Sequence, residues 1–454
     1  MEDKRNIISA IDIGTTKIIC IIAEKLENGK IKILGLGNSK STGVKRGVVQ
    51  NIPKTKEAVL NAVKQAEEQA GITIKDVYVG IAGQHIRSTE NSHSLIRENA
   101  ETEISIDEID KLKEMMFKTQ VGPGEEVLHV IPKTYIVDQE MDVEPLGMFG
   151  QQLTGNFHIV IGQTTSAKNI KKCINEVNDI QVNDLILEPL ASSYAVVTDE
   201  EKEVGVALID IGGGTTDIAV FHNNKIVHTA VIPLGGDVIT KDIKEAFKII
   251  ELKAEQLKIQ FGSALPDTIS KNDYVSIKGT STSKPIEIPI KSLAQVISAR
   301  VNEILDFVYY QISENIDPND LGAGIVLTGG GALLRNLSQF VAFKTGLQVR
   351  LGYPQKSVVT QLPEALNQTK YATSIGLILK GFELDKDKQR REESWQAEIK
   401  NEEQKIEENI EEQENTEEEN IKETSEKQKS GGFLGNLKVL IKDVFTPEED
   451  EKLE

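Results

Sequence analysis

The feature that most constrains the fold is a duplicated run of strand-like segments, at residues 7–37 and again at residues 204–234. Each copy has an apolar stretch that ends at an aspartate, then a turn rich in glycine and threonine, then two further apolar stretches. Asn-Gly at residues 28–29 and Asn-Asn at residues 223–224 predict hairpin turns at matching places. A helix-compatible segment follows each copy, so we expect two α/β units of one design with a cleft between them.

The composition limits the class of protein. The chain has 454 residues, of which 39% are hydrophobic and 27% charged, as in a soluble globular protein with two or three domains. A formal net charge of −19 argues against nucleic-acid binding, which needs a basic surface. Neither a signal peptide nor an apolar run of about 18 to 20 residues is visible, so we expect a cytoplasmic protein unless another segment attaches it to a membrane.

The two glycine-rich turns predict opposite walls of a phosphate-binding site. In each turn the residues after the aspartate can direct backbone N–H groups and hydroxyls at one point, which forms an anion-binding nest. An isolated glycine turn has little meaning, but two in duplicate units would hold a polyphosphate from both sides. The predicted residues are Asp12, Gly14, Thr15, Thr16 and Lys17 in the first turn, and Asp210, Gly212, Gly213, Gly214, Thr215 and Thr216 in the second.

The two strand-end aspartates predict a magnesium ion. Asp12 and Asp210 would face each other across the polyphosphate and repel it unless a cation lay between them. Because Mg²⁺ binds few carboxylates together with phosphates and keeps its waters, we predict that both aspartates contact Mg²⁺ through water. A simple strand-end cap is the alternative for either aspartate alone. Asp217 has no counterpart in the first copy, where Lys17 takes its position, and we assign it only to holding the shape of the turn.

Three other segments carry candidate site residues. The LTGGG run at residues 327–331 follows a strand and leads into a helix, which would let the flat base and ribose of a nucleotide approach the backbone. Glu188 follows an apolar strand end and is the candidate to orient a water for attack on a γ-phosphate. Glu255 and Lys258 lie three apart on one helical face, where a surface ion pair is the alternative.

Five segments resemble, in order, the motif set of the superfamily of actin, sugar kinases and seventy-kilodalton heat-shock ATPases. They are DIGTTK as phosphate-one, LEPLASSYA as connect-one, DIGGGTTD as phosphate-two, LTGGGA as the adenosine motif and YATSIGLIL as connect-two. Each motif alone is weak, but five in order are a specific signal. The resemblance spans residues 7–380 and implies an α/β, actin-like ATPase fold with two RNase-H-like domains around a nucleotide cleft.

Within that superfamily the chain resembles the FtsA family of actin-like bacterial cell-division proteins. The segment at residues 143–162 resembles a signature of that family, and the family carries its distinctive α+β subdomain (SHS2) where this chain has an insertion. The implied domains are a first RNase-H-like subdomain at 1–83 and 166–200, the inserted subdomain at 84–165, a second RNase-H-like subdomain at 201–234 and 317–380, and an insert in it at 235–316.

The resemblance also implies ligands and partners. ATP and Mg²⁺ would be the cofactors, held at their phosphates by the two turns. The residues that would hold adenosine are Gly329, Gly330 and Gly331, with Glu255 and Lys258 reaching its ribose and base. Glu188 corresponds to the position that orients the hydrolytic water, but FtsA proteins are poor ATPases, so ATP would favour actin-like polymerisation. The implied partners are the tubulin-like division protein FtsZ, other division proteins and further copies of the chain.

The C-terminal part predicts a tether and a membrane-binding helix. Residues 381–430 are rich in Asp and Glu and poor in large apolar residues, which indicates an acidic disordered linker. Residues 431–447 predict an amphipathic helix lying in the membrane interface, with docking onto its own domain or a protein partner as the alternative. Its apolar stripe is Phe433, Leu434, Leu437, Leu440, Ile441, Val444 and Phe445. Together with the resemblance, this predicts a peripheral protein on the cytoplasmic side of the cell membrane at the division site.

Other functions of the same fold stay open from the sequence. A chaperone would need a folded substrate-binding domain after residue 380, and a small-molecule kinase would need an aspartate base facing a sugar pocket. An actin-like platform of a pilus or secretion system would not need the amphipathic tail. Hydrolysis of ATP is left open, slow at most, and we expect mainly a scaffold protein.

Overall fold

The computed structural model describes residues 6–390 except for residues 142, 271, 278–284, 356–358 and 361–365. The predicted linker beyond residue 390 and the predicted membrane helix therefore lie outside the described residues. The chain divides into two compact units, residues 1–384 and 385–454, and the contacts described below lie in the first. Within the described part of the chain, no helix combines the length and the apolar character needed to cross a membrane.

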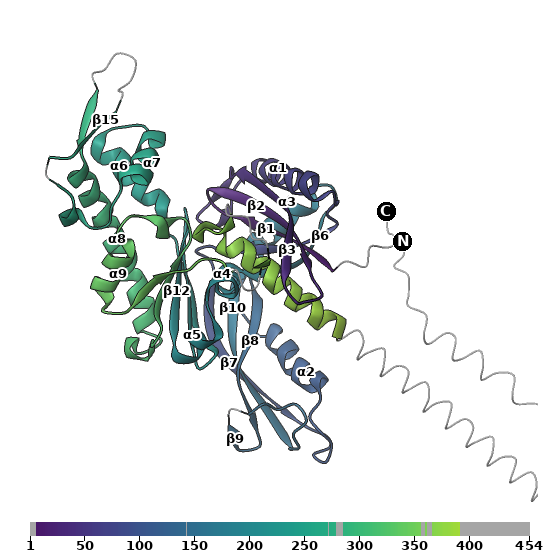
Figure 1. Ribbon diagram of the computed structural model, residues 1–454. Helices are drawn as coiled ribbons and strands as arrows, with labels where there is room; N and C mark the ends of the chain where they lie inside the picture. The colour runs from purple at the N-terminus through teal and green to yellow at the C-terminus, as the bar shows by residue number, and fades with distance from the viewer. Residues whose placement is uncertain are drawn as a thin grey trace, which may run out of the picture. The chain divides into compact units, whose positions relative to one another are not determined.

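Two β-sheets with one strand order form the centre of the first unit (Figure 1). In each sheet an antiparallel three-stranded meander continues into two parallel strands, as the duplicated sequence pattern predicts. The first sheet, β11-β6-β1-β2-β3-β19, contains β1 Ile7–Ile13, β2 Lys17–Lys25, β3 Ile31–Lys40, β6 Asp76–Ile81, β11 Gln181–Leu187 and β19 Val359–Thr360. The second sheet, β14-β13-β12-β17-β18, contains β12 Val206–Ile211, β13 Thr216–His222, β14 Lys225–Ile232, β17 Gly324–Thr328 and β18 Val349–Leu351.

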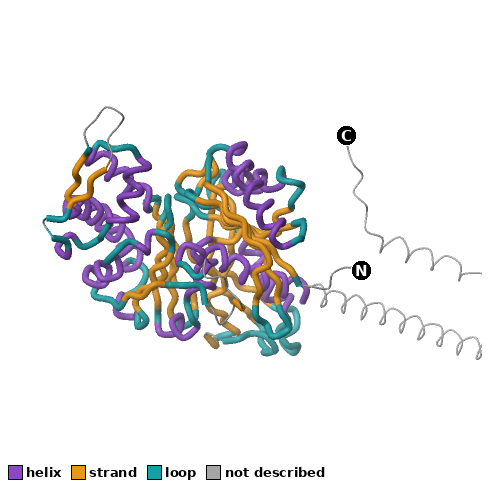
Figure 2. Tube along the Cα trace, turned by 45° about the horizontal axis from the view of Figure 1, so that its top comes forward, coloured by secondary structure: helices purple, strands orange, loops and turns teal. Residues whose placement is uncertain are grey.

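Helices cover the outer faces of both sheets and also lie between them (Figure 2). Apolar residues of α1 and α3 pack on the outer face of the first sheet, and those of α6 to α9 on the outer face of the second. The inner faces of both sheets share one core with α4 and the helix at residues 372–390. The named helices of these layers are α1 Ile52–Ala70, α3 Thr164–Asn175, α4 Glu188–Val196, α6 Gly236–Phe247, α7 Glu251–Phe261, α8 Ile290–Ser313 and α9 Leu337–Thr345.

An inserted subdomain occupies the connection between β6 and β11 (Figure 1). Its four-stranded sheet has the order β7-β10-β8-β9, and Leu112 of α2 and Phe157 of β10 are fully buried in its core. Its elements are β7 Arg87–Ile96, α2 Ile106–Phe117, β8 Glu125–Val137, β9 Glu140–Met141 and β10 Gln152–Gln163. Strand β10 begins before the apolar run at residues 157–161, and buried and partly exposed residues alternate in its first half.

Two helix boundaries differ from those predicted. The LTGGG run leads into a short 3₁₀ turn, η3 Gly331–Leu333, and α9 begins only at Leu337, because Asn336 has a left-handed φ of 62° that interrupts an α-helix. The last helix continues to residue 390, so the predicted linker start at residue 381 is too early. Phe382, only 3% exposed in the shared core, explains the extension. The remaining short elements are β4 Val44–Lys45, β5 Val48–Val49, α5 Asp199–Val204, β15 Tyr274–Ile277 and β16 Ile286–Pro289.

Candidate functional site

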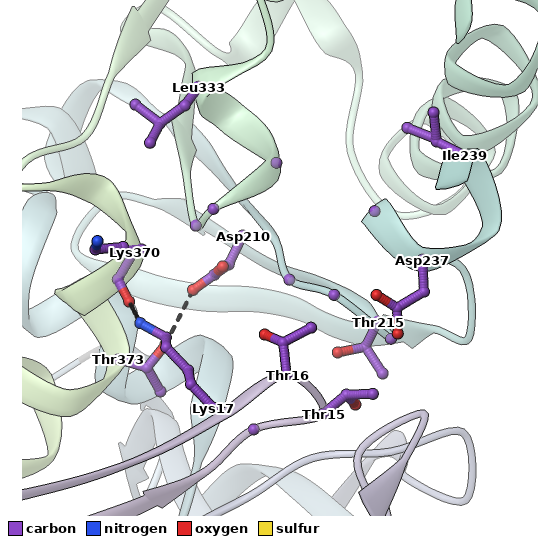
Figure 3. A pocket seen from close by; sticks show the side chains of 18 of the residues that line it. Thr15, Thr16, Lys17, Asp210, Thr215, Asp237, Ile239, Leu333, Lys370 and Thr373 are labelled. Carbon is purple, nitrogen blue, oxygen red and sulfur yellow. Dashed lines mark hydrogen bonds between the residues drawn. The ribbon is translucent and has the colours of Figure 1, made fainter. Parts of the chain in front are cut away.

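A cavity of about 710 Å³ lies where the two glycine-rich turns, the LTGGG turn, α6 and α7 meet. Figure 3 shows Thr15 and Thr16 of the first turn opposite Thr215 and Asp237 of the second half. With one exception, the residues predicted from the sequence all line this cavity. They are Asp12, Gly14, Thr15, Thr16, Lys17, Glu188, Asp210, Gly212, Gly213, Gly214, Thr215, Glu255, Lys258, Gly329, Gly330 and Gly331.

The exception is Thr216, and strand alternation explains it. Thr216 and Asp217 begin β13, so their side chains point to opposite faces of the sheet. Thr216 is fully buried and its hydroxyl donates to the carbonyl of Leu234 at 2.8 Å, so its side chain is not available to a ligand. Asp217, which the sequence assigned only to the shape of the turn, lines the cavity instead. Asp217 pairs with Asp210 across the hairpin, so strand alternation indicates that Asp217, and not Thr216, shares the face of Asp210.

The two turns touch, and glycine makes this possible. A Cβ atom at Gly213 would overlap the Thr16 methyl group, and one at Gly214 would overlap the Thr15 hydroxyl. The Thr15 hydroxyl also accepts a hydrogen bond of 3.1 Å from the backbone N–H of Gly47, in the tight β4–β5 hairpin. The cleft is therefore closed at this end by backbone and small side chains, which leaves polar backbone groups at the cavity surface.

Hydroxyl groups hold the two strand-end aspartates. Ser374 donates to Asp12 Oδ2 at 2.7 Å, and Ser192 and Thr373 donate to Asp210 Oδ2 at 2.7 and 3.1 Å. Both aspartates are 6% exposed. These donors come from α4 and the last helix, which lie between the sheets, so the inner helices fix the orientation of both carboxylates.

Four carboxyl groups share this small region and disturb one another. The pKa values of Asp12, Asp210, Asp217 and Glu188 are all raised, first because burial penalises the charged form. The pKa of Glu188 is raised well above its usual range, with additional repulsion from Asp12, Asp217 and Asp210. The pKa of Asp217 is likewise raised well above its usual range, by burial and then by the charge of Asp210.

Lys17 contributes a cation near the acids, and its ammonium group is hydrogen-bonded to a backbone carbonyl. Its ammonium group donates to the backbone carbonyl of Lys370 (Figure 3). It also lies 4.4 Å from the centre of the Tyr371 ring. Burial lowers the pKa of Lys17, and the charge of Asp12 opposes this shift. The lysine is thus partly desolvated at the edge of the cavity, where an anionic ligand would attract it.

Glu255 and Lys258 form a half-buried pair rather than a surface one. The Lys258 ammonium lies 2.7 Å from Glu255 and has a side chain only 14% exposed. It also donates to the carbonyl of Gly236 at 2.9 Å and to the hydroxyl of Thr240 at 2.8 Å. These contacts join α7 to the start of α6 and place both charges on the wall of the cavity.

The LTGGG turn reaches the cavity because its glycines allow close approach. Gly329 has a φ of 84°, and a Cβ atom there would overlap Asp210 Oδ1 and the carbonyl of Ile211. A Cβ atom at Gly331 would overlap the Ile211 side chain, whereas Gly330 has open space around it. The backbone at Gly330 is therefore free to lie against a flat ligand.

Several lining residues were missed by the sequence analysis. Asp237 follows Gly235 and Gly236 after β14, and a pair of glycines followed by an acid at a strand end was a usable signal. Lys370 comes from the segment just before the last helix and Thr373 from its first turn, and only tertiary folding brings them here. Apolar side chains complete the wall on α6, α7 and the LTGGG turn; they are Ile239, Ile259, Leu333 and Leu334.

The chemistry of the acidic end fits a hydrated divalent cation. Oδ1 of Asp217 is buried and has no hydrogen-bond partner among the described residues, and three other carboxyl groups with raised pKa values lie nearby. No group of three or more His, Cys, Asp or Glu side chains in the described part of the chain has the geometry to ligate a bare ion. Ligation through water, as Mg²⁺ prefers, agrees with both observations. The arrangement thus has an apolar end, a cationic edge and an acidic end.

Comparison with protein families gives two matches. The family described as cell division protein FtsA matches residues 207–376, and the SHS2 domain inserted in FtsA matches residues 83–161. The second match coincides with the inserted subdomain. It begins and ends within a few residues of β7 and β10.

Individual relatives cover most of the chain. The cell division protein FtsA of Neisseria meningitidis serogroup B is 38% identical over 380 residues, which are 83% of this chain and 91% of the relative. FtsA of Pseudomonas aeruginosa is 35% identical over 84% of this chain and 90% of its own length, and FtsA of Escherichia coli K12 is 33% identical over 84% and 91%.

Solved structures confirm the fold. The chain resembles the PilM-PilN type IV pilus biogenesis complex with a TM-score of 0.57 at 14% identity, over 82% of this chain and 98% of that one. It resembles MreB5 of Spiroplasma citri bound to ADP with a TM-score of 0.52 at 15% identity, over 84% and 98%. The predicted actin-like fold is thus confirmed, and the identity of its relatives places the chain in the FtsA family of cell division proteins.

Proposed function

We propose that this protein binds Mg²⁺·ATP in the cavity, assembles with further copies of itself in an actin-like way, and attaches FtsZ to the cytoplasmic face of the membrane. The observation that carries the proposal is the meeting of the two glycine-rich turns beside four buried carboxyl groups and Lys17. Phosphates would satisfy the turn N–H groups and Lys17, and Mg²⁺, held through water by Asp12 and Asp210, would offset the repulsion among the acids.

The rest of the cavity suits a nucleoside. The backbone at Gly329, Gly330 and Gly331 would lie against adenosine, and Glu255 and Lys258 would reach its ribose and base. The apolar wall formed by Ile259 and Leu333 is suited to a flat ring. MreB5, a protein of the same fold, is described as bound to ADP, which supports a nucleotide here.

Hydrolysis should be slow. Glu188 is the candidate to orient the attacking water, but burial, the largest cause, raises its pKa well above its usual range, which favours the neutral form. A neutral carboxyl group is a poor proton acceptor. Nucleotide binding would therefore act mainly by closing the cleft and favouring assembly, and the protein is mainly a scaffold rather than an enzyme.

Membrane attachment would use the predicted amphipathic helix at residues 431–447. Each apolar side chain gives roughly 1 kcal/mol on partial burial, and ordering the helix offsets much of the sum, so one copy should bind weakly. A polymer would bind firmly because many weak contacts act together. Family membership favours this function over a chaperone, a sugar kinase or a pilus platform, since the likeness to the pilus protein is one of fold alone.

Recruitment of FtsZ to lipid vesicles tests the proposal. Purified protein is mixed with FtsZ and vesicles containing anionic lipid, with Mg²⁺·ATP or without nucleotide, and FtsZ in the vesicle pellet is measured. We expect recruitment that increases severalfold with ATP. Asp210→Asn should remove the effect of ATP, whereas deletion of residues 431–454 should abolish pelleting with the nucleotide affinity unchanged. Equal pelleting of FtsZ with and without this protein would refute the proposal.

A further inference from the structure

The inserted subdomain contacts both halves of the cleft through buried histidines. His158 of β10, 2% exposed, lies with Nε2 3.0 Å from the hydroxyl of Thr229, which is 3% exposed in β14 of the second sheet. His129 of β8 accepts a hydrogen bond of 3.0 Å at Nε2 from the backbone N–H of Leu187, the residue before Glu188. The inserted subdomain is thus hydrogen-bonded to β14 on one side of the cavity and to β11 on the other.

A second hydrogen bond strengthens the contact with β14. The hydroxyl of Ser88 in β7 donates to the carbonyl of Thr229 at 2.9 Å, so that residue is held at both its side chain and its backbone. Strand β14 also packs against β7, β8 and β10, and Val231 packs on the core of the first half. The contact is a buried, ordered interface rather than a single surface hydrogen bond.

The residues that follow β14 are hydrogen-bonded to the second glycine-rich turn, at residues 210–217. The carbonyl of Leu234, just after the strand, accepts a hydrogen bond from the hydroxyl of Thr216. The backbone N–H of Asp237 donates to the carbonyl of Gly213 at 2.8 Å. A shift of β14 therefore displaces the wall of the cavity at Gly213. Thr229 is the point at which the inserted subdomain can resist such a shift.

We propose that the inserted subdomain holds the cleft in its closed form. His158 and Ser88 are positioning residues that hold β14 in place, and β14 in turn holds the second glycine-rich turn in the geometry that binds nucleotide. The inference rests on the proposed binding of ATP. The subdomain is continuous with the first half through β6 and α3, so rotation of the halves apart must break both contacts at Thr229 or bend the subdomain. Binding of ATP and closure of this contact then favour each other, as linkage requires.

Both histidines are suited to a fixed contact because they are neutral. Burial lowers the pKa of His158 to about 4, and burial likewise lowers the pKa of His129 to about 4. Nε2 of His129 accepts a hydrogen bond, which only the neutral ring can do. The contact is therefore formed throughout the neutral pH range.

The test compares two threonine variants of equal chemistry in the full chain. Thr229→Val removes the hydroxyl that meets His158, and the control Thr154→Val removes a hydroxyl 2.7 Å from Ser94, in the inserted sheet but away from β14. The affinity for Mg²⁺·ATP is measured by displacement of a fluorescent nucleotide. Since one hydrogen bond accounts for a severalfold change, we expect about fivefold weaker binding by Thr229→Val and no change in the control.

Hydrogen exchange gives a readout that a merely structural defect would not reproduce. ATP should slow amide exchange at residues 87–92 and 157–161 in the wild type and in Thr154→Val, but not in Thr229→Val. His158→Leu should behave like Thr229→Val, and His158→Gln, which keeps a polar group towards Thr229, should recover part of the affinity. Ser88→Ala serves where a substitution at Thr229 or His158 prevents folding, and it should weaken binding severalfold.

The outcomes separate this inference from the function on which it rests. No binding of ATP by the wild type would contradict the proposed function itself. Binding by the wild type with equal affinity in Thr229→Val, His158→Leu and Ser88→Ala would overturn the positioning role alone. The same conclusion would follow if ATP slowed exchange in the inserted subdomain equally in all variants.

Discussion

The first glycine-rich turn is at residues 12–17 and the second at residues 210–217. They occupy equivalent places in two sheets that share the order of their five common strands. They differ by two additional residues in the second turn and by the residue that ends each one, Lys17 against Asp217. The duplicated pattern therefore builds a cavity with matching walls but opposite charges at the two ends of the turns. A symmetrical pair would offer only attraction or only repulsion to a phosphate.

The surroundings of the two end residues increase this difference. The Lys17 ammonium has the carbonyl of Lys370 and the ring of Tyr371 as partners, whereas Oδ1 of Asp217 is buried and unpartnered among the described residues. Burial lowers the pKa of Lys17 and raises that of Asp217. The ends of the two turns thus differ in charge and in hydrogen bonding. In the proposed complex with Mg²⁺·ATP, Lys17 would attract phosphate and the acidic residue would favour the cation.

The largest expected effect is a loss of ATP affinity when Lys17, the cationic end of the first turn, is replaced. Lys17→Met removes the charge but keeps most of the length, and we expect ATP affinity to fall tenfold to a hundredfold, because a hydrogen bond to a charged group is worth roughly 1.5–3 kcal/mol. The same variant should not lower the melting temperature, since it removes a buried charge. Lys45→Met, on the exposed part of the neighbouring β4, is the matched control and should bind as the wild type. Unchanged affinity in Lys17→Met would remove the assigned difference between the turns.

The contact between the turns gives a second, smaller effect. Gly213→Ala places a methyl group against the Thr16 methyl, and overpacking of this kind costs roughly 1–3 kcal/mol. We expect about tenfold weaker binding of ATP, measured by displacement of a fluorescent nucleotide. Thr16→Ser, added to Gly213→Ala, removes the opposing methyl and should restore most of the affinity. If the double variant binds no better than Gly213→Ala alone, the turns do not close in the way described.

The sequence predicted the glycine-rich turns that line the cavity, but not the hydroxyl groups that orient its two strand-end aspartates. The turns were predictable because duplication and glycine content are local, and the choice of Thr216 over Asp217 failed only for lack of the strand alternation. Ser192, Thr373 and Ser374, which orient the two aspartates, lie far from them along the chain. Nothing local marks such hydroxyls as partners of Asp12 or Asp210, because their placement depends on how the inner helices pack.

The same limit applied to the fold. Helix α1 was predictable to within a residue, because a proline opens it and Gly71, in the left-handed conformation at φ 68°, ends it. The last helix was cut short in the prediction because the acidic composition begins before the packing ends; Phe382 is buried in the shared core and Leu384 packs against it. Composition reports average solubility, whereas one buried aromatic side chain is enough to extend a folded element.

The smallest expected effect is on the free energy of unfolding in the absence of metal, and it arises from Asp217 at the end of the second turn. In the folded protein the pKa of Asp217 is raised well above the unfolded value of 3.8, so the folded state binds more protons. The free energy of unfolding should therefore fall as pH rises from 3.8 through the raised folded pKa, in buffer with EDTA. Added Mg²⁺ should reduce this dependence, because a cation stabilises the charged carboxylates. Urea denaturation at a series of pH values measures both trends.

Asp217→Asn isolates the contribution of this residue. The amide keeps the shape and cannot ionise, so the free energy of unfolding at pH 8 in EDTA should rise by roughly 1–3 kcal/mol, the range for a buried unsatisfied polar group. The pH dependence should become flatter, and Mg²⁺ should enhance ATP binding less than in the wild type. Asp320→Asn, in a surface turn, should leave all three properties unchanged. A destabilised Asp217→Asn variant would mean that the carboxylate holds the turn together, and the second turn would then differ from the first in shape rather than in charge.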